Sequence, residues 1–144
     1  MRGWLFALLL ACLSAPVAAS GHCRQLAETV ARQQRLDAKA LGDILTALSR
    51  EGRLPANFVT KQQAQRAGWR PGHDLWQVLP HHSIGGDRFG NRERRLPKGD
   101  YREADLDYQG GKRGAKRLVY EAHGRRFVTT DHYQTFNEIP ACEP

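Results

Sequence analysis

Apolar residues recur at helical spacing in two stretches near the start of the chain. In the first, about 24–35, they are Leu26, Val30 and Ala31. In the second, about 38–50, they are Leu41, Ile44, Leu45 and Leu48. This spacing places them on one face of each helix, and Gly52 stands where a helix commonly ends. The pattern therefore predicts two consecutive amphipathic helices.

A third, shorter helix is indicated by Thr60 and Gln63. A hydroxyl residue followed three positions later by Gln is a capping box, which marks a helix start. We expect this helix to end near Gly68, with Lys61 in its first turn. The helix dipole does not favour a cation there. A functional role for Lys61 is therefore an alternative to an ordinary solvated surface lysine.

The second half of the chain has the patterns of β-structure. Segment 70–100 is rich in Gly, Pro and His and is typical of a loop, with a strand beginning near Ser83. Four later segments have strand patterns: 101–108, 117–122, 127–130 and 135–139. His123-Gly124-Arg125 is a candidate hairpin turn, which favours antiparallel pairing. Helices followed by strands predict an α+β fold, with the N-terminal helices packed on one face of a C-terminal antiparallel sheet.

The first nineteen residues have the pattern of a secretory signal peptide. Arg2 precedes an apolar run, and small residues lie before Ser20. The run is too short for a membrane anchor. Lipoprotein processing at Cys12 is a second alternative. We therefore expect a secreted protein with no membrane association after processing, divided into a signal peptide (1–19), an extension with an extra helix (20–37) and a main domain (38–144).

Two cysteines remain after that processing, Cys23 and Cys142. In an exported protein two cysteines are expected to form a disulfide. A zinc site that uses His22 together with both cysteines is the competing interpretation, but it lacks an obvious fourth ligand.

The charge of the chain narrows the class of partner. The formal net charge is +7, the 144 residues suit one domain, and most of the basic residues are arginine. Such a protein attracts polyanions, and arginine suits bidentate phosphate contacts. Charge alone leaves nucleic acid, anionic membrane and acidic protein open as partners.

Candidate chemistry is found in the C-terminal half. RNA carries its own nucleophile, the 2′-hydroxyl, so cleavage needs one base, one acid and cations for the phosphate, and no metal. Glu103 and His132 have suitable acid–base chemistry, and Arg113 and Arg117 are nearby cations. Each of these residues also has an ordinary structural interpretation, and their spacing alone does not decide between the two.

A family resemblance adds to this interpretation. Five segments carry it: 54–61, with Leu-Pro and Phe-Val-Thr-Lys; 64–69, with Ala-Gln and Gly-Trp; 83–93, with Ser-Ile-Gly-Gly-Asp and Asn-Arg-Glu; 102–108, with Arg-Glu-Ala-Asp and Tyr; and 129–136, Thr-Thr-Asp-His-Tyr-Gln-Thr-Phe. In order and spacing, segment 54–139 resembles the barnase-like extracellular guanyl-preferring ribonucleases of bacteria. The helix at 24–35 and the two cysteines are additions to that pattern.

The resemblance implies a role for each matching residue. Glu103 corresponds to the general base and His132 to the general acid. The phosphate-contacting cations are Lys61, Arg113 and Arg117. The base-recognition residues are Phe89, Asn91, Arg92, Glu93 and Tyr133. Asp105 corresponds to a buried carboxylate that supports the arginines.

The implied reaction uses no cofactor and no metal. Single-stranded RNA is cut 3′ of guanosine through a 2′,3′-cyclic phosphate, which water then opens. The resemblance also implies a monomer and an acidic inhibitor of the barstar kind. Alternatives are a non-catalytic basic module that binds RNA or an acidic protein, and a toxin delivered to neighbouring cells. Three loop histidines, His73, His81 and His82, match no family role.

Overall fold

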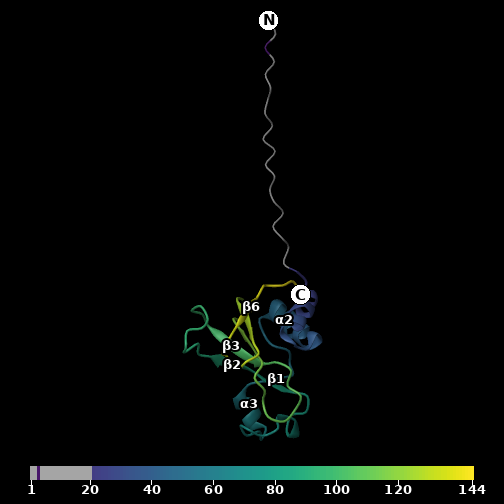
Figure 1. The fold of residues 1–144 in the computed structure, drawn as a ribbon. Helices are drawn as coiled ribbons and strands as arrows, with labels where there is room; N and C mark the ends of the chain where they lie inside the picture. The colour runs from purple at the N-terminus through teal and green to yellow at the C-terminus, as the bar shows by residue number, and fades with distance from the viewer. Residues whose placement is uncertain (1–2, 4–20) are drawn as a thin grey trace.

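A computed structural model describes residue 3 and residues 21–144. The expected signal peptide, 1–19, lies outside the described residues except at residue 3. The helices are α1 (Cys23–Gln34), α2 (Ala38–Glu51) and α3 (Lys61–Arg66), with a 3-10 turn at Leu75–Gln77. In Figure 1, α2 and the neighbouring purple-blue α1 lie on one side of the strands, and α3 lies beyond β1. The α+β arrangement predicted from the sequence is confirmed.

Six strands form one sheet in the order of the chain. They are β1 (Phe58–Val59), β2 (Ser83–Phe89), β3 (Tyr101–Asp105), β4 (Arg117–Tyr120), β5 (Arg126–Thr129) and β6 (Asn137–Ile139). All neighbours from β2 to β6 are antiparallel, as expected. At one edge the sheet has a single parallel pair, because β1 pairs with β2 in parallel. β1 was not expected.

Local hydrogen bonding explains the helix boundaries. Asp37 caps α2 by accepting a bond from the Ala40 N–H at 2.7 Å. Gly52 ends the helix in the left-handed conformation, at φ 65°, and its N–H donates a hydrogen bond to the Leu48 carbonyl at 2.9 Å. The capping box of Thr60 and Gln63 is present at the start of α3, so this prediction is confirmed.

The main core lies between α1, α2 and one face of the sheet. The helices contribute Ala27, Val30, Leu41, Ile44, Leu45 and Leu48. The strands and the residue after β3 contribute Ala104, Leu106, Leu118, Tyr120, Val128 and Ile139. We call this face of the sheet the helix face. Side chains alternate along a strand, so residues 101, 103 and 105 of β3 project from the opposite face, which we call the open face.

The extension is joined to the C-terminal segment. Cys23 and Cys142 form a disulfide, which confirms the predicted pairing. The zinc alternative is wrong, because both sulfurs are used in that bond. Beside it, the Cys23 N–H donates to the Glu143 carbonyl at 2.8 Å. No helix in the described part of the chain has both the length and the apolar character needed to cross a bilayer.

Candidate active site

The open face of β3 carries two carboxylates, Glu103 and Asp105. They project from the same face because they are two positions apart in a strand. Arg117 is the register partner of Asp105 on the neighbouring strand β4. The pairing of β3 with β4 therefore brings Glu103 and Asp105 close to Arg117.

Asp105 is the centre of an ion cluster with two arginines. It accepts hydrogen bonds from Arg113 Nε at 2.8 Å and Arg113 Nη2 at 2.7 Å, and it forms an ion pair with Arg117, whose Nε lies 3.0 Å from Asp105 Oδ1. The Asp105 side chain is 2% exposed and that of Arg117 is 4% exposed. Burial alone would lower the pKa of Arg113, but its hydrogen bonds to Asp105 and the charge of that carboxylate raise it. The Arg113 guanidinium is therefore held charged, and the contacts with Asp105 fix the orientations of both arginines.

Each arginine keeps a terminal nitrogen for a ligand. Arg117 Nη1 donates to the Gly114 carbonyl at 2.7 Å and to the Lys116 carbonyl at 2.8 Å. Within residues 21–144, Nη2 of Arg117 and Nη1 of Arg113 make no hydrogen bond. Two fixed cationic donors of this kind suit a phosphate group.

Tyr133 connects this cluster to Glu103. Its hydroxyl donates to Glu103 Oε2 at 2.8 Å and accepts from Arg117 Nε at 3.2 Å. Burial, together with the charge of Glu103 and the bond to it, raises the pKa of Tyr133 to about 12. The hydroxyl therefore stays protonated near neutral pH and holds one oxygen of the carboxylate. The other oxygen, Glu103 Oε1, faces Lys61.

Lys61 reaches Glu103 from the start of α3. Its Nζ lies 4.0 Å from Glu103 Oε1, and its side chain is 44% exposed against 12% for Glu103. The Lys61 backbone N–H donates to Asp87 Oδ2 at 3.0 Å, which anchors the first turn of α3 to β2. The cation that the helix dipole disfavours is thus placed beside a carboxylate, so the position of Lys61 has an electrostatic reason.

His132 lies in the loop between β5 and β6, with its side chain exposed. The backbone is left-handed at His132 (φ 55°) and Tyr133 (φ 68°). The His132 N–H donates to the Ala115 carbonyl at 3.0 Å, and its ring centroid is 4.8 Å from that of Tyr133. Tyr133 therefore contacts both expected acid–base residues.

Asp131 shapes this loop, a role that the sequence did not reveal. It accepts bonds from the hydroxyl and N–H of Thr135 at 2.6 and 2.9 Å, from the Thr129 hydroxyl at 2.9 Å, and from the Gln134 N–H at 3.1 Å. The bonds from Thr135 are the main cause that lowers the pKa of Asp131 to about 2. Asp and Asn often make such turns with following N–H groups, so this was the available signal.

The expected base-recognition residues lie around a hollow of about 210 Å³ next to this cluster. It is lined by Phe89, Gly90, Asn91, Arg92, Glu93, Arg95, Tyr133 and Phe136. All five predicted residues are among them. The Phe89 and Tyr133 rings are 5.4 Å apart and 22° from parallel. Asn91 closes the loop after β2, with Nδ2 donating to the Leu96 carbonyl at 2.9 Å and Oδ1 accepting from the Leu96 N–H at 3.1 Å.

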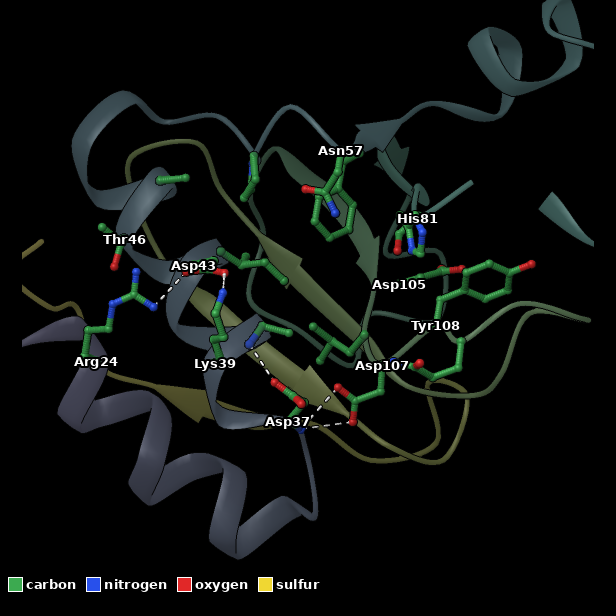
Figure 2. A pocket seen from close by; sticks show the side chains of 18 of the residues that line it. Arg24, Asp37, Lys39, Asp43, Thr46, Asn57, His81, Asp105, Asp107 and Tyr108 are labelled. Carbon is green, nitrogen blue, oxygen red and sulfur yellow. Dashed lines mark hydrogen bonds and ion pairs between the residues drawn. The ribbon is translucent and has the colours of Figure 1, made fainter. Parts of the chain in front are cut away.

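A larger hollow of about 620 Å³ lies elsewhere, against α2 (Figure 2). Its charged side chains neutralise one another: Asp43 pairs with Arg24 at 2.7 Å and with Lys39 at 3.0 Å. Neither Glu103 nor His132 lines it. We assign the candidate site to the smaller hollow and the adjacent ion cluster, because the unpaired donors and the exposed imidazole are there.

The three unassigned histidines do not form a metal site. In segment 21–144, no three His, Cys, Asp or Glu side chains are arranged to hold a metal ion. His81 packs against Trp76, with ring centroids 5.3 Å apart, and His82 Nδ1 lies 2.9 Å from the Pro80 carbonyl. Their contacts are local to the loop before β2.

Fold and site together define a small α+β protein with a cation-rich site around the carboxylate of Glu103 on the open face of its sheet. Comparison with known proteins gives the family: residues 45–140 match the ribonuclease family model, and the chain belongs to that family. Proteins named ribonuclease from Bacillus intermedius and Bacillus pumilus are each 49% identical over 96 residues, which is 64% of this chain. The aligned part spans 59% of those two relatives. A ribonuclease from Heyndrickxia coagulans is also 49% identical over 96 residues, 88% of its length.

Proposed function

We propose that this protein is a secreted, metal-independent endoribonuclease that cuts single-stranded RNA 3′ of guanosine. The arrangement on the open face carries this proposal. One carboxylate, Glu103, is held by Tyr133 and Lys61, and two arginines fixed by Asp105 present free donors beside it. Family membership and relatives named ribonuclease support it.

In the proposed first step, the phosphate is bound by Lys61, Arg113 and Arg117. Glu103 removes the proton of the 2′-hydroxyl, whose oxygen attacks phosphorus. His132 donates a proton to the leaving 5′-oxygen, and a 2′,3′-cyclic phosphate forms. The guanidiniums stabilise the negative charge that develops on the phosphoryl oxygens.

In the proposed second step the roles are reversed. His132 removes a proton from water, the hydroxide attacks phosphorus, and Glu103 returns a proton to the 2′-oxygen. The product carries a 3′-phosphate. DNA lacks the 2′-hydroxyl, so it can bind to the same cations without being cut.

The proposed base site is the hollow beside this cluster. The Phe89 and Tyr133 rings offer an apolar wall, and stacking on an aromatic side chain contributes about 1–3 kcal/mol per base. Glu93 would accept hydrogen bonds from the donor edge of guanine, with Asn91 and Arg92 shaping the loop. Adenine lacks that donor pattern. A site built for such hydrogen bonds discriminates strongly against a base that cannot make them.

We propose removal of residues 1–19 on export, an extension at 20–37, a ribonuclease domain at 38–144, and a monomer. An acidic inhibitor of the barstar kind would suit the cation-rich site, because it would pair with Lys61, Arg113 and Arg117.

Cleavage of a short RNA with a single guanosine tests the proposal. The wild-type protein should give a cyclic phosphate end after that guanosine, in the presence of EDTA. A substrate with 2′-deoxyguanosine at that position should stay intact. Glu103→Ala and His132→Ala should each lower the rate of cleavage by about 10³-fold or more, because each residue would act as an acid or a base in both steps of the reaction. Glu28→Ala, on the exposed side of α1, is the matched control and should cleave normally.

Two outcomes would contradict the proposal. One is full cleavage by either site variant, and the other is loss of activity with EDTA. Binding of RNA without cleavage by the folded wild-type protein would favour the non-catalytic binding module instead.

A further inference from the structure

Arg95 joins the two loops that border the hollow. It follows β2 by six positions, and its Nε donates to Glu93 Oε2 at 2.7 Å. Its Nη1 donates to the Gln134 carbonyl at 2.6 Å, across 39 positions of sequence. Gln134 lies two residues beyond His132. One guanidinium therefore contacts the expected base-recognition carboxylate and the loop of the expected acid.

Both loops have their own internal bonds, so the link connects two preformed units. On one side, the Asn91 side chain brackets Leu96 through two hydrogen bonds. On the other side, Asp131 accepts bonds from the N–H groups of Gln134 and Thr135. Arg95 is therefore a direct connection between two loops that are each held by their own hydrogen bonds.

The link leaves Glu93 able to accept further bonds. Arg95 uses Oε2 only, and Oε1 makes no hydrogen bond within residues 21–144. A carboxylate oxygen has two lone pairs, so Oε2 can also accept a second donor. The arginine thus holds Glu93 in one orientation at the hollow without using up its acceptors. Arg95 itself lines the same hollow.

We propose that Arg95 is a specificity-determining positioning residue. It orients Glu93 toward a base that offers two N–H donors, and it transmits the occupancy of the hollow to the loop of His132. This inference rests on the proposed function, in which Glu93 accepts from guanine and His132 acts as the acid. A guanine in the hollow fixes Glu93, Glu93 fixes Arg95, and Arg95 fixes the Gln134 backbone next to the imidazole.

The pair adds little to the stability of the fold. The Arg95 side chain is 40% exposed and that of Glu93 is 71% exposed, and ion pairs at such sites contribute little. We therefore expect Arg95→Ala to fold as the wild-type protein does, which a thermal unfolding curve checks.

The test compares Arg95→Ala with Arg94→Ala. Arg94 is the exposed neighbour of Arg95 and does not line the hollow. Because both residues are arginines, the two substitutions change the net charge equally. kcat and KM are measured for matched RNAs with guanosine or adenosine before the cut. In Arg95→Ala the guanosine preference should fall at least about tenfold, the size of one lost hydrogen bond to a charged group. Much of the loss should be in kcat for guanosine. Arg94→Ala should keep the preference.

Arg95→Lys separates charge from geometry. An ammonium keeps the charge but lacks the planar fork that reaches Glu93 and Gln134 together, so it should restore only part of the preference. Full restoration by lysine would show that charge alone matters and would overturn the positioning role. Equal selectivity in the alanine variants would overturn it as well.

Binding of guanosine 3′-phosphate and adenosine 3′-phosphate makes the result independent of turnover. If the wild-type protein binds the guanosine nucleotide selectively and Arg95→Ala does not, the role of Arg95 is supported even if no RNA is cut. Unselective binding by the wild-type protein, or selectivity that survives in Arg95→Ala, overturns it.

Discussion

The two ends of the β4–β5 hairpin each bury an arginine, but in opposite electrostatic settings. On the open face, Arg117 is 3% exposed, pairs with Asp105 and donates a hydrogen bond to the Tyr133 hydroxyl. On the helix face, Arg126 is 5% exposed. It donates to Ser49 Oγ at 3.1 Å and contacts the sulfur of Cys142 at 3.5 Å.

Arg126 has no carboxylate partner within residues 21–144, and its Nε has no hydrogen-bond partner there. Burial accordingly lowers the pKa of Arg126.

We call the cluster of Asp105, Arg113, Arg117, Tyr133 and Glu103 the site region. We call Arg126, Ser49 and the disulfide the closure region.

The difference shows what each region is built to hold. In the site region, ion pairs with Asp105 fix two arginines. Each arginine still has a terminal nitrogen that can donate hydrogen bonds to an anionic ligand. In the closure region a covalent bond fixes the chain, and the buried cation opposes folding rather than supporting it. The first region is therefore held together by ion pairs and hydrogen bonds, and the second by the covalent link and apolar packing.

Removal of the central carboxylate should have the largest effect. Asp105→Ala leaves two buried guanidiniums without their counter-charge, and breaking a buried pair from one side costs about 3–5 kcal/mol. RNA cleavage should fall with it, because Arg113 and Arg117 lose their orientation. Urea unfolding followed by fluorescence measures the change. Asp43→Ala is the control, since Asp43 also pairs with two cations, Arg24 at 2.7 Å and Lys39 at 3.0 Å, but its side chain is 39% exposed. An equal loss in both variants would refute the special role of Asp105.

Loss of the disulfide should be the next largest effect. The bridge closes a sequence separation of 119 residues, and removing such a native link costs about 2–5 kcal/mol. Cys23→Ser combined with Cys142→Ser should lower the free energy of unfolding, measured by urea titration, by that amount. The rate of RNA cleavage under conditions where the variant is folded should not change, because the bridge is on the helix face. Wild-type protein treated with dithiothreitol is the control and should match. A folded variant that has lost cleavage would contradict the independence of the two regions.

Acid should lower the free energy of unfolding through Asp131, in the loop between β5 and β6. The pKa of Asp131 is about 2 in the folded protein against an ordinary value of 3.8. A depressed folded pKa contributes stability above pH 3.8, and this stability is lost as the pH falls toward 2. Asp131→Asn should therefore flatten the fall in unfolding free energy between those pH values. Denaturant titrations at several pH values measure it. An unchanged dependence of unfolding free energy on pH would show that Asp131 does not contribute to it.

Removal of the unpaired cation should have the smallest effect. Arg126→Met fills similar space without a buried charge, so its stability should lie within about 1 kcal/mol of the wild-type value or above it. Arg117→Met makes the same chemical change at the paired site and should be clearly destabilising. Thermal unfolding of the two variants side by side decides the matter. Similar losses would show that pairing does not distinguish the two arginines.

Much of the fold was predictable because its signals are local. The capping box of α3 lies within four residues, and the apolar stripes of α1 and α2 each fit one helix. β1 was missed because two residues carry no alternation, and its bonds come from β2, about 25 positions later. β3 ends three residues earlier than predicted, at Asp105, and Asp107 has a left-handed backbone at φ 55°.

The arrangement of the candidate site could be predicted only where strand alternation or family likeness applies. Alternation places Glu103 and Asp105 on one face, and family likeness directs attention to Lys61 and His132. The bond from Arg95 to Gln134 could not be predicted, because it depends on how two distant loops approach. Arg126 was not expected in the core, because hydropathy places arginine at the surface.

The disulfide turns most of the described chain into a covalent ring. Any single backbone cut between Cys23 and Cys142, for example in the loop at 70–82, opens that ring without producing two separate molecules. The segments on either side of the cut stay joined through sulfur, at a high effective concentration for each other. Strands that pair across such a cut can therefore find one another again, so a nicked chain keeps a route back to the same sheet.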